Sequence, residues 1–385
     1  MLEIGKAEIQ AVDRVLTSGK LFRYHRGGEC QTFEAEWGAY VGAKHVQLTA
    51  SGSTALASAL ASLGIGPGDE VIVPAHTYMA TATAVVATGA IPVIVDIDDS
   101  ITLDPDAVDR AVGPRTRAVI PVHMWGQICD MRRLKAVARK HKLFIVEDCC
   151  QAIGGSYKGR MVGTFADAGC YSFNFFKNMT CGEGGAVVSK TRTAHEKVVI
   201  QTDCCGYFWE GPSKTEGFCG PSARVSEIEG AILREQLKRI PGLIAKLRKH
   251  KARLIADTAD TGLTLSPRHD PDGECATSLY YQLPSVEQAA EFAKLVGCGI
   301  TGKTGRHTYN EWTPILAKRG HIHPALDPFK MEANTDCRMD YHPDMCPVSL
   351  DILNRTAMIT LAHGWKAADL KARAKTIRDA AKAVL

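Results

Sequence analysis

Three segments of the sequence carry residue types that could bind one aromatic, phosphorylated ligand. The first is the run ASGST at residues 50–54, which follows an apolar run and precedes a helical pattern. Small residues let the backbone approach an anion, and the first turn of a helix offers free N–H groups with partial positive charge. The run therefore predicts a phosphate site, although serine and threonine are equally common as plain helix caps.

The second and third segments carry an acid and a lysine. Glu147 and Asp148 end an apolar run, and Gln151 follows. An acid at the end of a buried strand needs a partner, which a protonated ring nitrogen or a structural ion pair would supply. Lys177 stands between an aromatic run and a glycine-rich turn, and apolar surroundings favour the neutral amine that attacks a carbonyl. A phosphate, a protonatable ring nitrogen and an aldehyde are the groups of pyridoxal 5′-phosphate (PLP).

The elements that must position these residues alternate through the first half of the chain. Strands rich in Val and Ile are predicted at 46–49, 70–73, 92–96, 118–122 and 144–148, with helices at 54–63, 81–88 and 131–141. This alternation predicts a mostly parallel sheet covered on both faces, with ligands outside the carboxyl ends of its strands. Two further strands, 169–173 and 185–189, flank the glycine-rich turn.

The pattern changes after residue 226. Residues 227–259 form a long helical pattern with a break at Pro241–Gly242. A strand (278–283), a helix (286–296), a loop-rich stretch (302–347), a strand (357–361) and a closing helix (367–385) follow. We therefore predict a large α/β domain with an N-terminal helix over residues 1–240, and a smaller α+β domain over residues 241–385.

Composition narrows the class of protein. The 385 residues are 45% hydrophobic and 23% charged, with a net charge of +4 and scattered basic residues, so we expect no nucleic-acid partner. There is neither an apolar run of ~18 residues nor a signal-peptide pattern, so we expect no membrane span and a cytoplasmic location. The 13 cysteines lack C-x-x-C spacing, and His321 and His323 have no further ligand nearby, so we expect buried thiols and no metal site.

In four places the sequence resembles the DegT/DnrJ/EryC1/StrS family of fold-type-I, PLP-dependent aminotransferases, which aminate keto sugars. The matching segments are SGSTAL (51–56), GIGPGDEVIVPAHTYMATATAV (64–85), VEDCCQAIGGSYKG (146–159) and CYSFNFFKNMTCGEGGAVV (170–188). The resemblance implies an α/β fold in which a large domain has a mostly parallel, seven-stranded sheet and a smaller α+β domain follows. It also implies a homodimer with shared active sites.

Within the family, the sequence looks most like the transaminases that make 8-amino-3,8-dideoxy-octulosonate. Residues 121–126 are also similar to aminodeoxyhydroxybenzoate synthases and cyclitol transaminases. The resemblance implies that Lys177 is the catalytic lysine that binds the cofactor, and that Asp148 is the partner of the pyridine nitrogen. The other implied cofactor contacts are Gln151 at the ring hydroxyl, Tyr78 stacked on the ring, and Gly52, Ser53 and Ser172 at the phosphate.

The amino group is expected to move from glutamate or glutamine to a keto or aldehyde group of a sugar-like acceptor, which is a sugar acid, a nucleotide-linked keto sugar or a cyclitol. Ser222 falls where the family has a longer asparagine that reaches the phosphate of the neighbouring subunit. Two alternatives are a PLP-dependent dehydratase or lyase, and a non-catalytic PLP-binding regulator; family dehydratases replace the lysine with histidine, so Lys177 favours transamination. The expected substrate contacts are Arg23, Arg26, His307, Tyr309 and Trp312.

Overall fold

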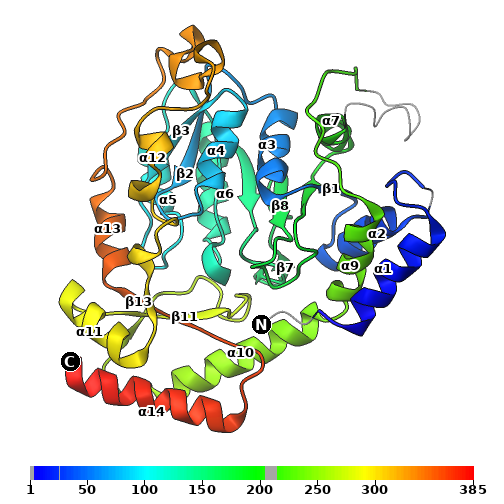
Figure 1. Ribbon diagram of the computed structural model, residues 1–385. Helices are drawn as coiled ribbons and strands as arrows, with labels where there is room; N and C mark the ends of the chain where they lie inside the picture. Colours follow the sequence, from blue (N-terminus) through cyan, green and yellow to red (C-terminus); the bar gives the residue numbers. More distant parts are fainter. Residues whose placement is uncertain (1–3, 26, 204–214) are drawn as a thin grey trace.

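A seven-stranded sheet lies at the centre of the computed structural model, which describes residues 4–25, 27–203 and 215–385 (Figure 1). Its order is β1-β9-β8-β5-β4-β2-β3, and only β9 runs antiparallel to its neighbours. The mostly parallel α/β sheet predicted from the sequence is thus confirmed. The strands are β1 (His45–Thr49), β2 (Glu70–Pro74), β3 (Ile91–Val95), β4 (Thr116–Val119), β5 (Phe144–Asp148), β8 (Ala168–Ser172) and β9 (Gly185–Ser189).

Alternate residues of most of these strands enter two different cores, one on each face of the sheet. Along β2, Ile72 packs in the first core, whereas Val71 and Val73 pack in the second. This follows from the two-residue repeat of a strand, and it explains why these strands are continuous apolar runs. The first core is covered by α2 (Glu29–Val41), α5 (Pro105–Ala111) and α6 (Met131–His141), and the second by α3 (Gly52–Ser62), α4 (Ala80–Ala87) and α7 (Arg192–Thr202).

The long helical pattern after residue 226 forms two helices rather than one. Helix α9 (Glu227–Leu237) packs on α2 and on α1 (Lys6–Ser18), and α10 (Ile240–Asp257) continues toward the C-terminal part of the chain. The break falls before Pro241 rather than at it, because proline is accepted in the first turn of a helix, where its missing N–H has no intrahelical acceptor.

A second, four-stranded sheet of order β10-β11-β13-β12 lies against α10, at the bottom of Figure 1. It packs on α11 (Val286–Val296) and α14 (Ala367–Val384), and its apolar cluster is separate from the two cores of the large sheet. The remaining strands are β10 (Thr264–Leu265), β11 (Ser278–Gln282), β12 (Gly299–Ile300) and β13 (Thr356–Thr360), with a small hairpin of β6 (Ser156–Tyr157) and β7 (Arg160–Met161).

Residues 309–346 return to the large sheet. Tyr309, Trp312 and Cys346 are buried in the second core, beside α3 and α4. The short helix α12 (Thr313–Leu316) lies in this segment, and α13 (Pro347–Asn354) follows it. The loop-rich stretch predicted at 302–347 therefore covers the large sheet, and the division of the chain at residue 240 stays a prediction.

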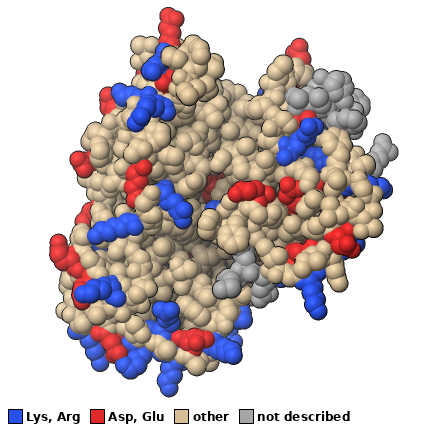
Figure 2. All heavy atoms as spheres, viewed as in Figure 1, with Lys and Arg blue, Asp and Glu red and all other residues tan. Residues whose placement is uncertain are grey.

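Charged side chains of both signs are interspersed over the face shown in Figure 2, with no continuous block of one sign. This distribution agrees with the small net charge of +4. Within the described part of the chain, no helix combines the length and the apolar character needed to cross a membrane.

One ion pair connects the returning segment to the amino-terminal end of β2 in the large sheet. The carboxylate of Glu70, at the start of β2, accepts hydrogen bonds from the main-chain N–H of Arg338 (2.8 Å) and from its guanidinium Nε (3.0 Å). Burial by itself would raise the pKa of Glu70, but the hydrogen bonds and charge of Arg338 outweigh burial and hold this pKa below the ordinary 4.5.

We expect Arg338→Met to lower the free energy of unfolding at pH 7 by about 2 kcal/mol, because it leaves the buried carboxylate without its cation. A carboxyl group with a lowered folded pKa stabilises the protein above its unfolded pKa, and this contribution is lost as the pH falls through the folded value. The difference in free energy of unfolding between variant and wild type should therefore become smaller below pH 4.5. Urea titrations at pH 7 and at a pH below 4.5 measure the free energies of unfolding of variant and wild type. Arg192→Met removes an exposed arginine that pairs with Glu196, and serves as a control for which we expect a small effect.

Candidate active site

A cavity of about 780 Å³ opens at the carboxyl ends of β1, β2, β5 and β8. In an open parallel sheet this edge is where ligands bind. The opposite wall comes from the smaller sheet and includes Thr277, Met358 and His363. Eight residues singled out from the sequence line this one cavity: Gly52, Ser53, Tyr78, Asp148, Gln151, Ser172, Lys177 and His307.

Lys177 is carried by the loop between β8 and β9. The loop folds as a closed hairpin, because Phe175 donates its N–H to the carbonyl of Gly182 (2.9 Å) and Lys177 donates its own to Asn174 (3.0 Å). Gly182 has φ of +93°, a backbone conformation that favours glycine. The glycine-rich turn therefore lets the hairpin close and holds a half-buried lysine at the cavity wall.

The predicted phosphate turn is the N-terminus of α3. Ser51 caps this helix by accepting a hydrogen bond from the N–H of Thr54 (3.1 Å), so the N–H groups of Gly52 and Ser53 keep no intrahelical acceptor. A Cβ atom at Gly52 would stand 2.7 Å from the Cβ of Ser172, and one at Gly185 would stand 2.4 Å from the carbonyl oxygen of Ser51. Glycine at both positions lets β8 and β9 approach the turn, which brings the Ser172 hydroxyl beside it.

Asp148 ends β5 with its carboxylate buried and fixed. One oxygen accepts a hydrogen bond from the Thr81 hydroxyl (2.8 Å), and the other accepts from the N–H of Cys150 (3.0 Å). Thr81 is itself paired with the hydroxyl of Thr77 (2.7 Å). The acid therefore faces the cavity with a set orientation and no neighbouring cation within ion-pairing distance among the described residues.

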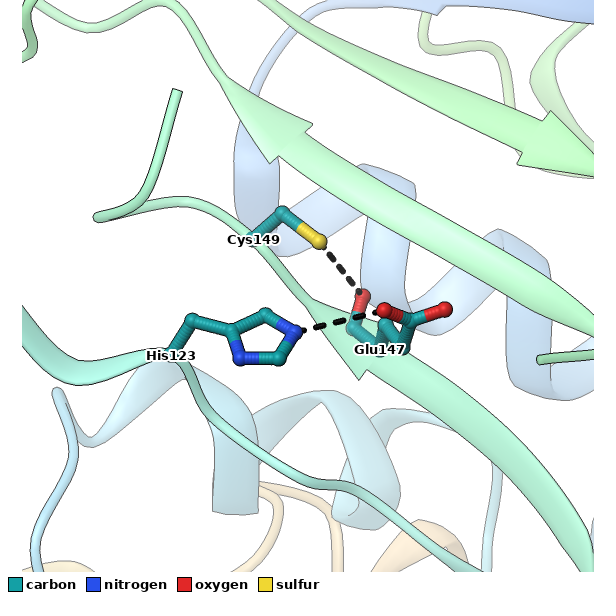
Figure 3. Close-up of side chains that lie close together, drawn as sticks. All are labelled: His123, Glu147 and Cys149. Carbon is teal, nitrogen blue, oxygen red and sulfur yellow. Dashed lines mark hydrogen bonds and ion pairs between the residues drawn. The ribbon is translucent and has the colours of Figure 1, made fainter. Parts of the chain in front are cut away.

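Glu147 points to the opposite face of β5, as the alternation of a strand requires. His123 Nε2 lies 3.2 Å from its carboxylate, and the N–H groups of Gly163 (2.7 Å) and Phe165 (2.6 Å) donate to the same group. Figure 3 shows the imidazole turned toward Glu147, with the thiol of Cys149 directed at the main-chain carbonyl of Glu147.

This cluster has the residue types of a metal site but a different hydrogen-bonding state. His123 Nδ1 accepts the N–H of Cys129 (3.2 Å), and the carboxylate oxygens of Glu147 are already occupied by donors. Burial, with the nearby acids, raises the pKa of the Cys149 thiol well above its ordinary value, whereas a metal binds the thiolate. The cluster is a satisfied structural network behind Asp148, whose carbonyl accepts the main-chain N–H of His123 (3.0 Å).

Three rings that line the cavity, those of Tyr78, Trp125 and His307, form an aromatic wall. The His307 ring lies 5.9 Å from Tyr78 and 5.1 Å from Trp125, between centroids. Burial, with the positive charges of Arg306 and Lys177 among the further contributors, lowers the pKa of His307 to about 3. The imidazole is therefore neutral at physiological pH, and this wall combines apolar ring surface with a neutral polar group.

Three expected substrate contacts lie away from the cavity. Arg23 is buried and donates to Glu34 (2.9 Å), because a buried guanidinium requires an acid partner. Tyr309 donates to the carbonyl of Pro343, and Trp312 is buried with it in the second core. These large side chains hold the returning segment on the sheet instead of contacting a ligand.

The two other predicted residues are placed differently. Arg26 lies outside the described residues. Ser222 is exposed and does not line the cavity, but the carbonyl of the next residue, Ala223, accepts the N–H of Ala50 (2.8 Å). The segment that carries Ser222 thus lies beside the phosphate turn of its own chain.

Several residues that line the cavity were missed in the sequence. Thr81 contacts Asp148 across 67 positions, and Trp125 and Cys150 come from separate loops. Trp125 has φ of +46°, and its carbonyl accepts hydrogen bonds from Thr277 (2.7 Å) and Tyr280 (3.1 Å). These contacts join elements far apart in the chain, so no local pattern could have indicated them.

Comparison with known proteins shows which sequences and folds this chain is similar to. Residues 2–312 match the sequence profile of the DegT/DnrJ/EryC1/StrS aminotransferase family. The spore coat polysaccharide biosynthesis protein SpsC of Bacillus subtilis is 34% identical over 330 residues, which cover 83% of this chain and 83% of SpsC. The L-glutamine:2-deoxy-scyllo-inosose aminotransferase of Streptomyces paromomycinus is 33% identical over 372 residues, 92% of this chain and 87% of that protein.

A solved structure of 3-amino-5-hydroxybenzoic acid synthase superposes with a TM-score of 0.80 at 27% sequence identity. The superposition covers 99% of this chain and 97% of that chain. The fold and the order of the matching segments therefore agree along nearly the whole sequence, and the chain belongs to the DegT/DnrJ/EryC1/StrS aminotransferase family.

Proposed function

We propose that this enzyme uses PLP to move an amino group from glutamate or glutamine to a keto or aldehyde group of a sugar-like acceptor. The observation that carries the proposal is that Lys177, Asp148 and the N-terminus of α3 line one cavity. These are an amine, a carboxylate and an anion seat, which match the aldehyde, the ring nitrogen and the phosphate of one cofactor. When bound, PLP supplies the aldehyde that carries the amino group and a ring that accepts electrons.

The residues present fit that cofactor. Gly52 and Ser53 offer main-chain N–H groups to the phosphate, and Ser172 adds a hydroxyl beside them. Asp148, oriented by Thr81, holds a proton on the ring nitrogen. Two further cavity residues complete the set, Tyr78 against the ring face and Gln151 at the ring hydroxyl.

Lys177 performs two tasks in this proposal. Its Nζ would hold the aldehyde of PLP when the cofactor is bound. The same amine, once free, would carry the proton of the donor's α-carbon, which is general acid–base catalysis by one group. The negative charge of Asp148 would stabilise a protonated ring nitrogen of the bound cofactor.

The acceptor class follows from the relatives and from the cavity. The relative from Streptomyces paromomycinus is named for a cyclitol ketone, and one from Streptomyces venezuelae, 43% identical over 60% of this chain, is named a dTDP-3-amino-3,4,6-trideoxy-alpha-D-glucose transaminase. Both names describe hydroxylated rings with a keto group or the amine derived from it. The aromatic wall of Tyr78, Trp125 and His307 suits such a ring. An octulosonate acceptor, a sugar acid, belongs to the same proposal.

A homodimer with shared active sites is also part of the proposal. Phe175 and Phe176, on the hairpin that carries Lys177, are 56% and 76% exposed, and Leu21, Phe22 and Phe218 are exposed as well. Exposed aromatic side chains at a cavity rim are typical of a protein interface. A second copy of the chain is the partner that the family resemblance implies.

A cytoplasmic location completes the proposal. Every cysteine in the described ranges is a free thiol, and most are buried. Free thiols in this number suit a reducing compartment.

Lys177→Ala should lose amino transfer by more than 10²- to 10⁴-fold, because it removes both the proton carrier and the covalent anchor. Amino product is measured by mass spectrometry with glutamate or glutamine and a panel of keto sugars and keto cyclitols. Borohydride reduction should fix PLP on the peptide spanning Asn174–Thr180 in wild type and in Lys190→Ala, an exposed control. A Lys177→Ala protein that transaminates at the wild-type rate would refute the assignment.

Asp148→Asn should separate cofactor binding from catalysis. The amide keeps the size of the side chain but not its charge, so covalent attachment at Lys177 should persist while the donor half-reaction slows by about 10²- to 10³-fold. Stopped-flow absorption measures the half-reaction. An unchanged rate would show that this carboxylate does not act on the ring nitrogen.

The oligomeric state can be tested directly. Light scattering after gel filtration should give twice the chain mass of 41.6 kDa. Replacing both Phe175 and Phe176 with serine should shift the mass toward the monomer, because these exposed rings lose their apolar contact. A monomeric wild type would overturn the proposed dimer.

A further inference from the structure

A guanidinium stands at the mouth of the cavity without an acid to pair with. Arg306 is the single arginine among the described residues that line the cavity, where it neighbours Phe176, Lys177 and His307. Its guanidinium carbon lies 5.7 Å from the centre of the Phe176 ring. Within the described residues Arg306 makes no ion pair. Arg23, the arginine expected to contact substrate, is paired with Glu34.

The backbone on both sides of Arg306 is held in place. Glu311 accepts the N–H groups of Gly305 (2.7 Å) and His307 (2.9 Å), and the carbonyl of His307 accepts the N–H of Thr77 (2.9 Å), next to the sheet. The guanidinium therefore projects from a fixed point and is stacked on one ring. Such an arrangement loses little freedom when it binds a ligand.

The charges around Arg306 leave it uncompensated. His307 is neutral, and the acids of the cavity wall are engaged elsewhere, Asp148 with Thr81 and Glu183 with Asn174 (2.8 Å). Glu311 lies beside the backbone of Arg306, but its carboxylate accepts main-chain N–H groups, and within the described residues no acid forms an ion pair with the guanidinium. A planar guanidinium matches a carboxylate through two parallel hydrogen bonds.

We propose that Arg306 is the carboxylate-binding residue of the substrate site. The inference rests on the proposed aminotransferase function and names the chemistry of the ligand: the α-carboxylate of the amino donor, or the carboxylate of a sugar-acid acceptor. Both substrates of a transaminase use one site in turn, so one guanidinium is available to either. The cofactor phosphate is excluded as its partner, because the phosphate seat lies at α3 beside Ser172.

The test is binding to the PLP-loaded enzyme by isothermal titration calorimetry. Glutarate mimics the donor without an amine, and glutaramide is its uncharged counterpart; 5-keto-D-gluconate and L-sorbose form the matching acceptor pair. Arg306→Gln should weaken the charged ligand about 10- to 100-fold and leave the uncharged one unchanged. Arg306→Lys should have an intermediate affinity for the charged ligands. Lys303 is an exposed cation on the same loop that does not line the cavity, so Lys303→Gln should bind the ligands as wild type does.

The donor pair and the acceptor pair of ligands identify which substrate supplies the carboxylate. Weaker binding of glutarate to Arg306→Gln indicates that Arg306 binds the carboxylate of the donor. Weaker binding of 5-keto-D-gluconate alone indicates that it binds the carboxylate of the acceptor. Either result supports the proposal. Wild-type protein that binds neither acid, or a variant that binds both as wild type does, overturns it. Equal loss of charged and uncharged ligands also overturns it, because it indicates a structural role. Amino transfer that survives in Arg306→Gln while binding is unchanged refutes this inference alone, whereas the Lys177→Ala experiment tests the reaction itself.

Discussion

The end of β5 is the constraint on which the site depends. Two adjacent acids there face opposite sides of the sheet, so one carboxylate is buried behind the strand and the other faces the cavity. The network of Glu147 with His123, Gly163 and Phe165 fixes the strand end from behind. A register slip of one residue would exchange the two acids and place the hydrogen-bonded structural one in the cavity. The chemistry of Asp148 therefore rests on the packing of its neighbour.

The phosphate turn depends on close backbone approach in the same way. Gly52 and Gly185 lie where a Cβ would meet Ser172 or Ser51, so the crossing of β8 and β9 with the start of α3 requires glycine at both positions. This crossing also sets where the hairpin of Lys177 begins, since that hairpin leaves β8 and enters β9. The anion seat and the lysine are thus held at a fixed separation by the sheet itself rather than by a flexible loop.

Much of this architecture could be predicted because it depends on local sequence patterns. The strand at 185–189 and the helices at 131–141 and 286–296 have the predicted bounds, since each segment has an apolar repeat and each helix has capping residues directly beside it. Lys177, Asp148 and Gly52 could be selected from short motifs for the same reason, and all three line the cavity. Arg23, Tyr309 and Trp312 were misplaced because their loops gave no sign of burial, which depends on partners such as Glu34 that are distant in the sequence or in the fold. Thr81 and Arg306 escaped notice because their roles arise only when separate elements meet.

The charge distribution of the cavity gives it two distinct ends. At the sheet edge lie the N-terminus of α3 and the carboxylate of Asp148, the two groups that we propose for the phosphate and the ring nitrogen of the cofactor. At the mouth, a cation and a neutral imidazole stand beside aromatic rings. Burial, with the charges of His76, Arg306 and Lys177 contributing, lowers the pKa of His307 and keeps it uncharged, so the guanidinium of Arg306 stands beside a neutral imidazole. A hydroxylated ring with a single carboxylate is the ligand that we propose for this end, where the aromatic rings would contact its apolar faces and the guanidinium its charge.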